Sequence, residues 1–118
     1  MNNQLKPLGL FFFAKEKGNE PVREWLKTLS KTDKKIIGED IKTVQYGWPL
    51  GMPLVRSLDQ GLWEVRTKLR GSREARVIFF MAEDTMVLAN GFIKKTPKTP
   101  KAELDLAKSR KKVFESRK

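Results

Sequence analysis

The chain contains no cysteine and no histidine. Without thiols it can form neither a disulfide nor a thiolate metal site, and without imidazole it lacks the other usual ligand of structural zinc. Zinc-stabilised folds are therefore excluded, and we expect no metal and no other cofactor. The absence of disulfides is compatible with a reducing compartment, and we expect the protein to be cytoplasmic.

The sequence also lacks any long hydrophobic run. The apolar residues 8–14 follow Lys6 and resemble a signal peptide, but they lead directly into Lys15 without a small-residue cleavage site. We interpret this segment as a strand. No stretch approaches the roughly 18 apolar residues that a membrane span needs. The sequence therefore predicts no membrane partner.

Acidic residues are scarce relative to basic ones: the chain has 14 Asp and Glu but 25 Lys and Arg, and the formal net charge is +11. The excess is concentrated in residues 62–81 and 94–118. A localised positive excess favours a polyanionic partner, either nucleic acid or an acidic protein. The length fits one domain, 1–118, with a basic C-terminal helix or tail over about residues 97–118.

Three strand-like runs lie between Leu62 and Lys95. In the first run, alternation places Trp63 and Val65 on one face and Glu64 and Arg66 on the other. The next run, 76–81, is almost continuously apolar after its first residue, as expected of a central strand. Polar turns separate the runs, so they predict an antiparallel meander, to which residues 54–58 can add a short edge strand.

The remaining periodic segments indicate helices. Val22, Trp25, Leu26 and Leu29 have helical spacing, and so do Ile37, Ile41 and Val44. A third helix is expected to begin near Lys101. We therefore predict an α+β fold with an N-terminal strand, an antiparallel helical hairpin, a three- to four-stranded antiparallel meander and a C-terminal helix.

The order of these motifs resembles the RelE/ParE toxin superfamily, and most closely its phage-derived HigB-like branch. The resemblance is carried by the Trp63-Glu64-Val65-Arg66 strand, by Arg76 at the start of the next strand, and by residues 91–100, GFIKKTPKTP. It covers the chain from about the first predicted helix to the tail. One departure is Asn90, which stands where that branch often has histidine.

This resemblance implies a RelE/ParE-like domain with two helices on one face of an antiparallel sheet. It also implies the toxin of a type II toxin–antitoxin system, which cuts messenger RNA in the ribosomal decoding site without a metal. The implied partners are the ribosome, mRNA and a cognate antitoxin with a helix-turn-helix domain. The superfamily also includes DNA gyrase poisons, and a non-catalytic basic nucleic-acid-binding module is a further alternative.

Metal-free RNA cleavage uses the neighbouring 2′-OH as nucleophile, so the protein must stabilise charge on phosphorus and transfer protons. Guanidinium groups suit the first task, which favours Arg66 and Arg76. Lys68 or Lys95 can accept a proton when other cations crowd it, whereas arginine cannot. Replacing Arg76 by alanine is expected to abolish toxicity and to leave the fold intact. The expected RNA contacts are Arg70, Arg73, Asn90, Phe92, Lys94 and Lys98.

Each assignment has a structural alternative. The cations of the first strand can form a solvated sheet face, Arg76 can form a salt bridge with Glu64 or Glu74, and Phe92 can belong to the core. The basic tail can be a solvated terminus or a contact with ribosomal RNA. Sequence alone leaves these alternatives open.

Overall fold

The computed structural model describes residues 6–96 and 98–117. Five strands and three α-helices make up these residues, with a short 3-10 turn at Asp59–Gly61 before the third strand. The elements, in chain order, are β1 (Gly9–Phe12), α1 (Pro21–Lys27), α2 (Lys31–Gly47), β2 (Val55–Ser57), β3 (Leu62–Lys68), β4 (Glu74–Ala82), β5 (Thr85–Ile93) and α3 (Lys101–Ser116). The predicted α+β class is confirmed.

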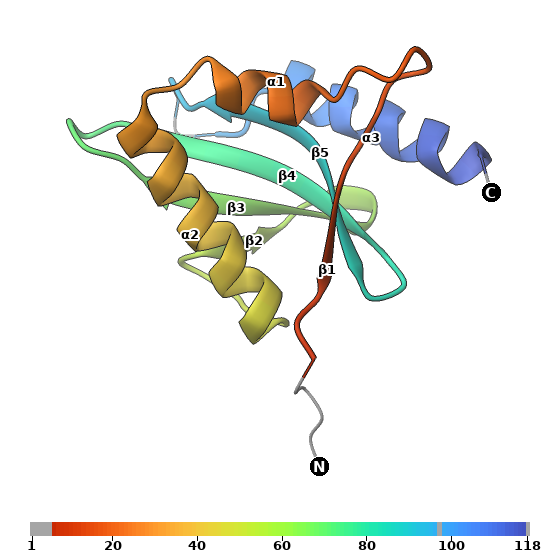
Figure 1. Ribbon diagram of the computed structural model, residues 1–118, viewed down its shortest axis with the longest axis horizontal. Helices are drawn as coiled ribbons and strands as arrows, with labels where there is room; N and C mark the ends of the chain where they lie inside the picture. Colours follow the sequence, from red (N-terminus) through yellow and green to blue (C-terminus); the bar gives the residue numbers. More distant parts are fainter. Residues whose placement is uncertain (1–5, 97, 118) are drawn as a thin grey trace.

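The strands form one sheet in the order β1-β5-β4-β3-β2 (Figure 1). Strands β2 to β5 are an antiparallel meander, with the edge strand β2 included. The sheet differs from the prediction at its other edge, where β1 pairs with β5 in parallel. It is therefore mixed rather than wholly antiparallel, because the N-terminal strand runs in the same direction as the last one.

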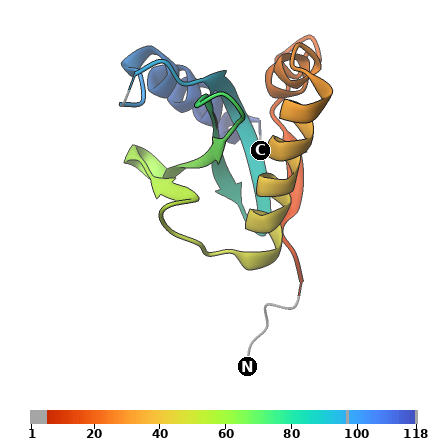
Figure 2. The same cartoon turned by 90° about the vertical axis from the view of Figure 1, so that its left-hand side faces the viewer.

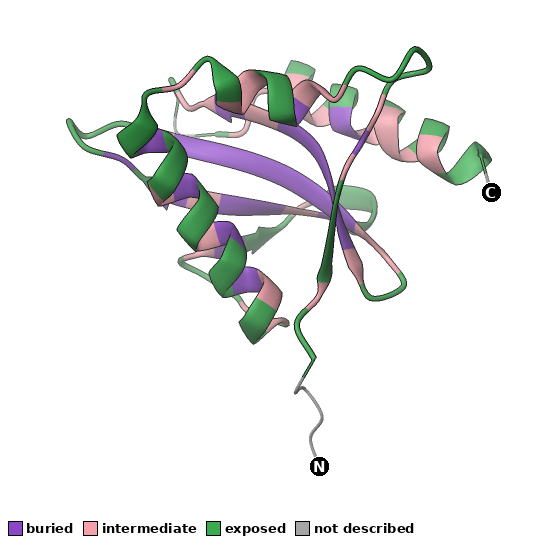
Figure 3. Cartoon of the chain, in the orientation of Figure 1, coloured by how far each residue is buried: buried purple, intermediate pink, exposed green. Residues whose placement is uncertain are grey.

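Helices cover both faces of the sheet. Figure 2 shows α1 and α2 on one side and α3 on the other. Val22 of α1 and Ile37 of α2 belong to one buried cluster, whereas Ala107 of α3 belongs to a second. We call these sides the α1/α2 face and the α3 face. Burial is concentrated in the central strands, whereas the edge strand β1 is largely exposed (Figure 3).

The two N-terminal helices do not form the predicted antiparallel hairpin. They lie at an open angle to one another, and α1 packs on β5 and β1 whereas α2 packs on β3 (Figure 1). The short spacing between them indicated direct helix-on-helix packing, but each helix buries its apolar stripe against the sheet instead. The two helices do share one face of the sheet, as expected.

A β-bulge in β5 changes which side chains reach the α3 face. Ile78 pairs with Asn90 and Phe79 pairs with Leu88, so Ala89 is an extra residue in the register. An extra residue shifts the alternation of the strand by one position. As a result Ala89 and Asn90 both contact α3.

In the described part of the chain, no helix combines the length and the apolar character needed to cross a membrane.

Candidate active site

Arg66 and Arg76 occupy directly opposed positions on β3 and β4. Opposed residues of antiparallel strands place their side chains on the same face of the sheet. Ile78 and Phe80 have the same alternation as Arg76 and belong to the cluster on the α3 face. The two arginines that the sequence singles out are therefore neighbours on the α3 face, although their environments differ sharply.

The Arg76 side chain is completely buried and paired with two carboxylates. Its Nη2 atom donates to Glu74 Oε1 over 2.8 Å, and its Nη1 atom donates to Glu64 Oε1 over 3.4 Å. Glu64 is also completely buried, and its other oxygen accepts a hydrogen bond of 2.7 Å from the Thr99 hydroxyl. At the other end, Lys94 Nζ lies 3.3 Å from Glu74 Oε1. These five residues form one network, which we call the Arg76 network.

Charge balance keeps this network ionised. Burial lowers the pKa of Arg76, and the charge of Arg66 acts in the same direction, whereas Glu64 and Glu74 oppose the shift. Arginine nevertheless remains protonated in proteins. Burial raises the pKa of Glu74. The hydrogen bond and the charge of Lys94 lower this pKa, as do the charges of Arg76 and Arg66, and together they outweigh the effect of burial. The network is therefore a set of compensated charges.

Arg66 is not part of any ion pair in the described residues. Its side chain is partly exposed, and its only side-chain hydrogen bond there runs 3.4 Å to the Met52 sulfur, which is a weak acceptor. The nearby carboxylates of Glu64 and Glu74 are paired with Arg76. The Arg66 guanidinium is therefore available to bind a ligand. This residue can donate two hydrogen bonds to a phosphate.

Further cations surround Arg66 and the Arg76 network. Three of them are exposed and have no carboxylate partner within the described ranges: Arg56, Lys68 and Lys98. Lys68 is opposed to Glu74 across β3 and β4, and Arg56 is opposed to Glu64 across β2 and β3. The α3 face therefore carries a positively charged surface around a buried, compensated centre, with free guanidinium groups at two positions.

Four of the predicted site residues have other surroundings. Arg76 itself is enclosed, so the salt-bridge alternative is what the structure contains, and its guanidinium does not reach solvent. Phe92 is nearly buried in the core cluster under α3 and offers no stacking platform. Asn90 is also buried, donates to Glu103 and accepts from Arg110 of α3 over 3.3 Å. Its amide joins α3 to the sheet, and burial lowers the pKa of Arg110 beside it.

Arg73 is the fourth predicted site residue with other surroundings. Its Nη1 and Nη2 atoms donate to the two carboxylate oxygens of Asp33 in α2, over 2.7 and 3.0 Å. The backbone N–H of Asp33 donates to the Ser30 hydroxyl, the N-terminal cap of α2. Hydrogen bonding from Arg73 lowers the pKa of Asp33 although partial burial opposes it. Arg73 thus holds the β3–β4 turn against the start of α2, and its guanidinium is engaged by Asp33. A contact of Arg73 with RNA stays a prediction. Arg70 is exposed in the same turn.

Lys94 and Lys98 do lie at the site, the first in the Arg76 network and the second at its rim. Lys95 is exposed beyond the end of β5, next to Lys94 in the chain, and no ion pair or side-chain hydrogen bond among the described residues joins it to Arg66 or to the Arg76 network. Its role as a base stays a prediction.

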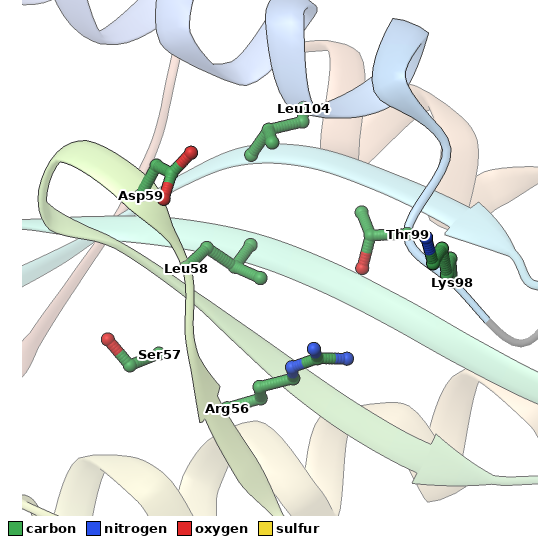
Figure 4. Close-up of a pocket in the computed structure, with 7 residues that line it drawn as sticks. All are labelled: Arg56, Ser57, Leu58, Asp59, Lys98, Thr99 and Leu104. Carbon is green, nitrogen blue, oxygen red and sulfur yellow. The ribbon is translucent and has the colours of Figure 1, made fainter.

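Two residues of the site were not expected from the sequence, Arg56 and Thr99. Both line a pocket of about 350 Å³ on the α3 face (Figure 4). Arg56 lies in the segment expected as an edge strand, and the register of β2 on β3 would have placed it opposite Glu64. Thr99 lies between two prolines, in a segment where no periodicity predicts which side chains face the sheet.

The fold is that of a small α+β domain with a cationic sheet face beside its C-terminal helix. Residues 24–112 match a family model described as phage derived protein Gp49-like. The chain therefore belongs to the Gp49-like family of phage-derived proteins, which is associated with toxin–antitoxin systems and is RelE-like. No curated protein matches the chain significantly.

Proposed function

We propose that this protein is the toxin of a type II toxin–antitoxin pair and that it cuts mRNA on the ribosome without a metal ion. The observation that carries the proposal is Arg66: a partly exposed arginine with no carboxylate partner in the described residues, directly beside the Arg76 network. Family membership supports a toxin-like role. The residues for the chemistry lie on the α3 face.

Cleavage through the 2′-OH produces extra negative charge on the scissile phosphate, which preorganised donors stabilise. Arg66 is the residue that we assign to the two non-bridging oxygens. Arg76 acts as a positioning residue, since it binds Glu64 and Glu74 and so prevents both carboxylates from capturing Arg66 or repelling the phosphate. Two unpaired carboxylates at this point would cancel the charge that Arg66 supplies.

Proton transfer is assigned to Lys68, which is two residues from Arg66 on the same side of β3 and is exposed. Its amine can take the 2′-OH proton when it is in the neutral form. The 2′-oxygen then bonds to phosphorus, the bond between phosphorus and the 5′-oxygen breaks, and the leaving 5′-oxygen takes a proton from water. Lys95 is the second candidate for this step. The chain has no histidine to act as the base, which favours an amine for this step.

The proposed dependence on the ribosome follows from the shape of the site. On the α3 face Arg66 is partly exposed, Lys68 and Arg56 are exposed, and Arg66 does not line the pocket that contains Arg56. An exposed protein surface positions a flexible RNA strand poorly, because ordering the reacting groups has a large entropic cost. A partner that already holds the RNA in one conformation removes most of this cost. The ribosome holds mRNA in one conformation and would present it to this surface. The proposed antitoxin has a helix-turn-helix domain.

The experiment is primer extension on mRNA from cells that express the protein, with parallel assays for DNA breaks. Discrete cuts in translated message, absent when initiation of the same message is blocked, are expected. Intact message together with DNA breaks would instead assign the protein to the gyrase poisons. If both the message and the DNA stay intact, the proposal is overturned. The cationic face would then serve a non-catalytic nucleic-acid-binding module.

A further inference from the structure

The pocket on the α3 face lies between β2 and the start of α3 and adjoins the Arg76 network. Its wall contains Arg56, Leu58 and Asp59 from the β2 side, and Lys98, Thr99 and Leu104 from the α3 side (Figure 4). The volume of about 350 Å³ falls in the range of small-ligand sites. The Thr99 hydroxyl donates to Glu64, so pocket and network share this side chain.

Arg56 has no ion-pair partner among residues 6–96 and 98–117, although it lies opposite a carboxylate. Glu64 is its cross-strand partner, but both Glu64 oxygens are engaged, one by Thr99 and the other by Arg76. Figure 4 shows the Arg56 guanidinium extending toward Thr99 and Lys98 across the pocket. Arg56 and Lys98 therefore line one opening as two cations that have no carboxylate partner in the described part of the chain, an arrangement that suits a phosphate group.

The other end of the pocket has the chemistry of a nucleobase site. Leu58 and Leu104 supply apolar walls for a flat ring. Asp59 is 73% exposed and lies 3.8 Å from Lys108 Nζ, so only a loose ion pair engages its carboxylate. A carboxylate is an acceptor only, and it binds best to two adjacent donors. Among the RNA bases, guanine has such an edge, formed by its N1–H and its amino group, whereas uracil offers one donor between two acceptors.

We infer that this pocket binds a guanine nucleotide of the mRNA, with Arg56 and Lys98 on its phosphate and Asp59 on its base. This inference rests on the proposed function for its substrate, since the nucleotide would adjoin the phosphate held by Arg66. The site would make cleavage prefer positions next to G. Asp59 is then a specificity-determining residue, separate from the residues assigned to the reaction.

Binding is tested without any cleavage, by titrating the purified protein with 5′-GMP and, separately, with 5′-UMP. Backbone amide NMR signals of Arg56, Asp59 and Leu104 are expected to shift with GMP, and UMP is expected to bind at least about tenfold more weakly, given the two charge-assisted bonds. Asp59→Asn should remove this selectivity, because an amide cannot accept both donors. Asp40→Asn on α2, on the other side of the sheet, is the matched control and should keep it.

The cleavage assay then separates the two proposals. In wild type, cuts are expected to cluster next to G, and in Asp59→Asn the clustering is expected to be lost while cuts persist. If wild type cuts without any preference for G and binds GMP no better than UMP, the guanine site is refuted and the nuclease stands. If GMP binds selectively but no message is cut, the nuclease is refuted and the site stands.

Discussion

Arg66 and Arg76 are opposed residues on neighbouring strands, yet one side chain is partly exposed and the other is completely buried. The difference arises because Arg76 lies on a central strand between Glu64 and Glu74, whereas Arg66 lies toward the β2 edge of the sheet. The two arginines therefore have different tasks. Arg76 neutralises carboxylates inside the domain, and Arg66 remains available to a substrate.

We predict that Arg76→Ala destabilises the protein, contrary to the expectation from sequence that the fold would be unaffected. Removing the guanidinium leaves the completely buried Glu64 without its cation, and losing one partner of a buried pair costs about 3–5 kcal/mol. The free energy of unfolding, measured in urea, should fall by this amount. Replacing both residues with methionine should restore much of it, since an apolar pair leaves no charge uncompensated. An unchanged unfolding midpoint in Arg76→Ala would contradict this account of the network.

We predict that Asp33→Asn lowers stability at neutral pH but not in acid. The hydrogen bond from Arg73 lowers the pKa of Asp33 below its ordinary value of 3.8. A lowered pKa in the folded state contributes stability above the unfolded value, and that stability is lost as the pH falls through the folded value. The thermal midpoints of wild type and variant should therefore differ at pH 7 and approach one another as the pH falls below 3.8. A difference that persists unchanged into acid would rule out the ion pair as its source.

We predict opposite effects of alanine at two glycines. A Cβ atom at Gly91 would lie 2.5 Å from a Trp25 ring carbon, so α1 would have to move away from β5. Overpacking of this kind costs about 1–3 kcal/mol. At Gly38, an exposed position in α2, a Cβ atom would meet nothing within 4 Å, and alanine should stabilise the helix by up to about 1 kcal/mol. Equal unfolding free energies for the two variants would show that α1 does not pack on β5 as described.

Much of this fold is encoded locally. The alternation in residues 62–69 predicts β3 and its two faces, and the helical spacing of Ile37, Ile41 and Val44 predicts α2. The parallel pairing of β1 with β5 could not be predicted in this way, because it joins segments from opposite ends of the chain. Neither could the open angle between α1 and α2, which is set by the sheet beneath them.

In the candidate site too, local patterns predict some features, whereas others depend on contacts between segments distant in the sequence. The sequence suggests that the cations of the meander, Arg66 and Arg76 among them, converge on one sheet surface. It cannot predict that Arg76 is completely buried whereas Arg66 stays partly exposed. Asn90 was expected at the RNA surface, whereas the bulge at Ala89 turns it toward α3. The ion pair of Arg73 with Asp33 could not be predicted for a similar reason, since the two residues are 40 positions apart in the sequence.

The most direct test of the account measures cleavage of a defined mRNA on purified translating ribosomes by wild type, Arg66→Ala and Lys35→Ala. Lys35 is an exposed cation on α2, on the other side of the sheet, so its variant controls for net charge. We predict that Arg66→Ala cuts at least about 100-fold more slowly, the usual effect of losing one donor to the developing charge, and that Lys35→Ala cuts like wild type. The Arg66 variant should unfold at the wild-type midpoint. Wild-type cleavage by a folded Arg66→Ala variant would contradict the central claim that this guanidinium holds the scissile phosphate.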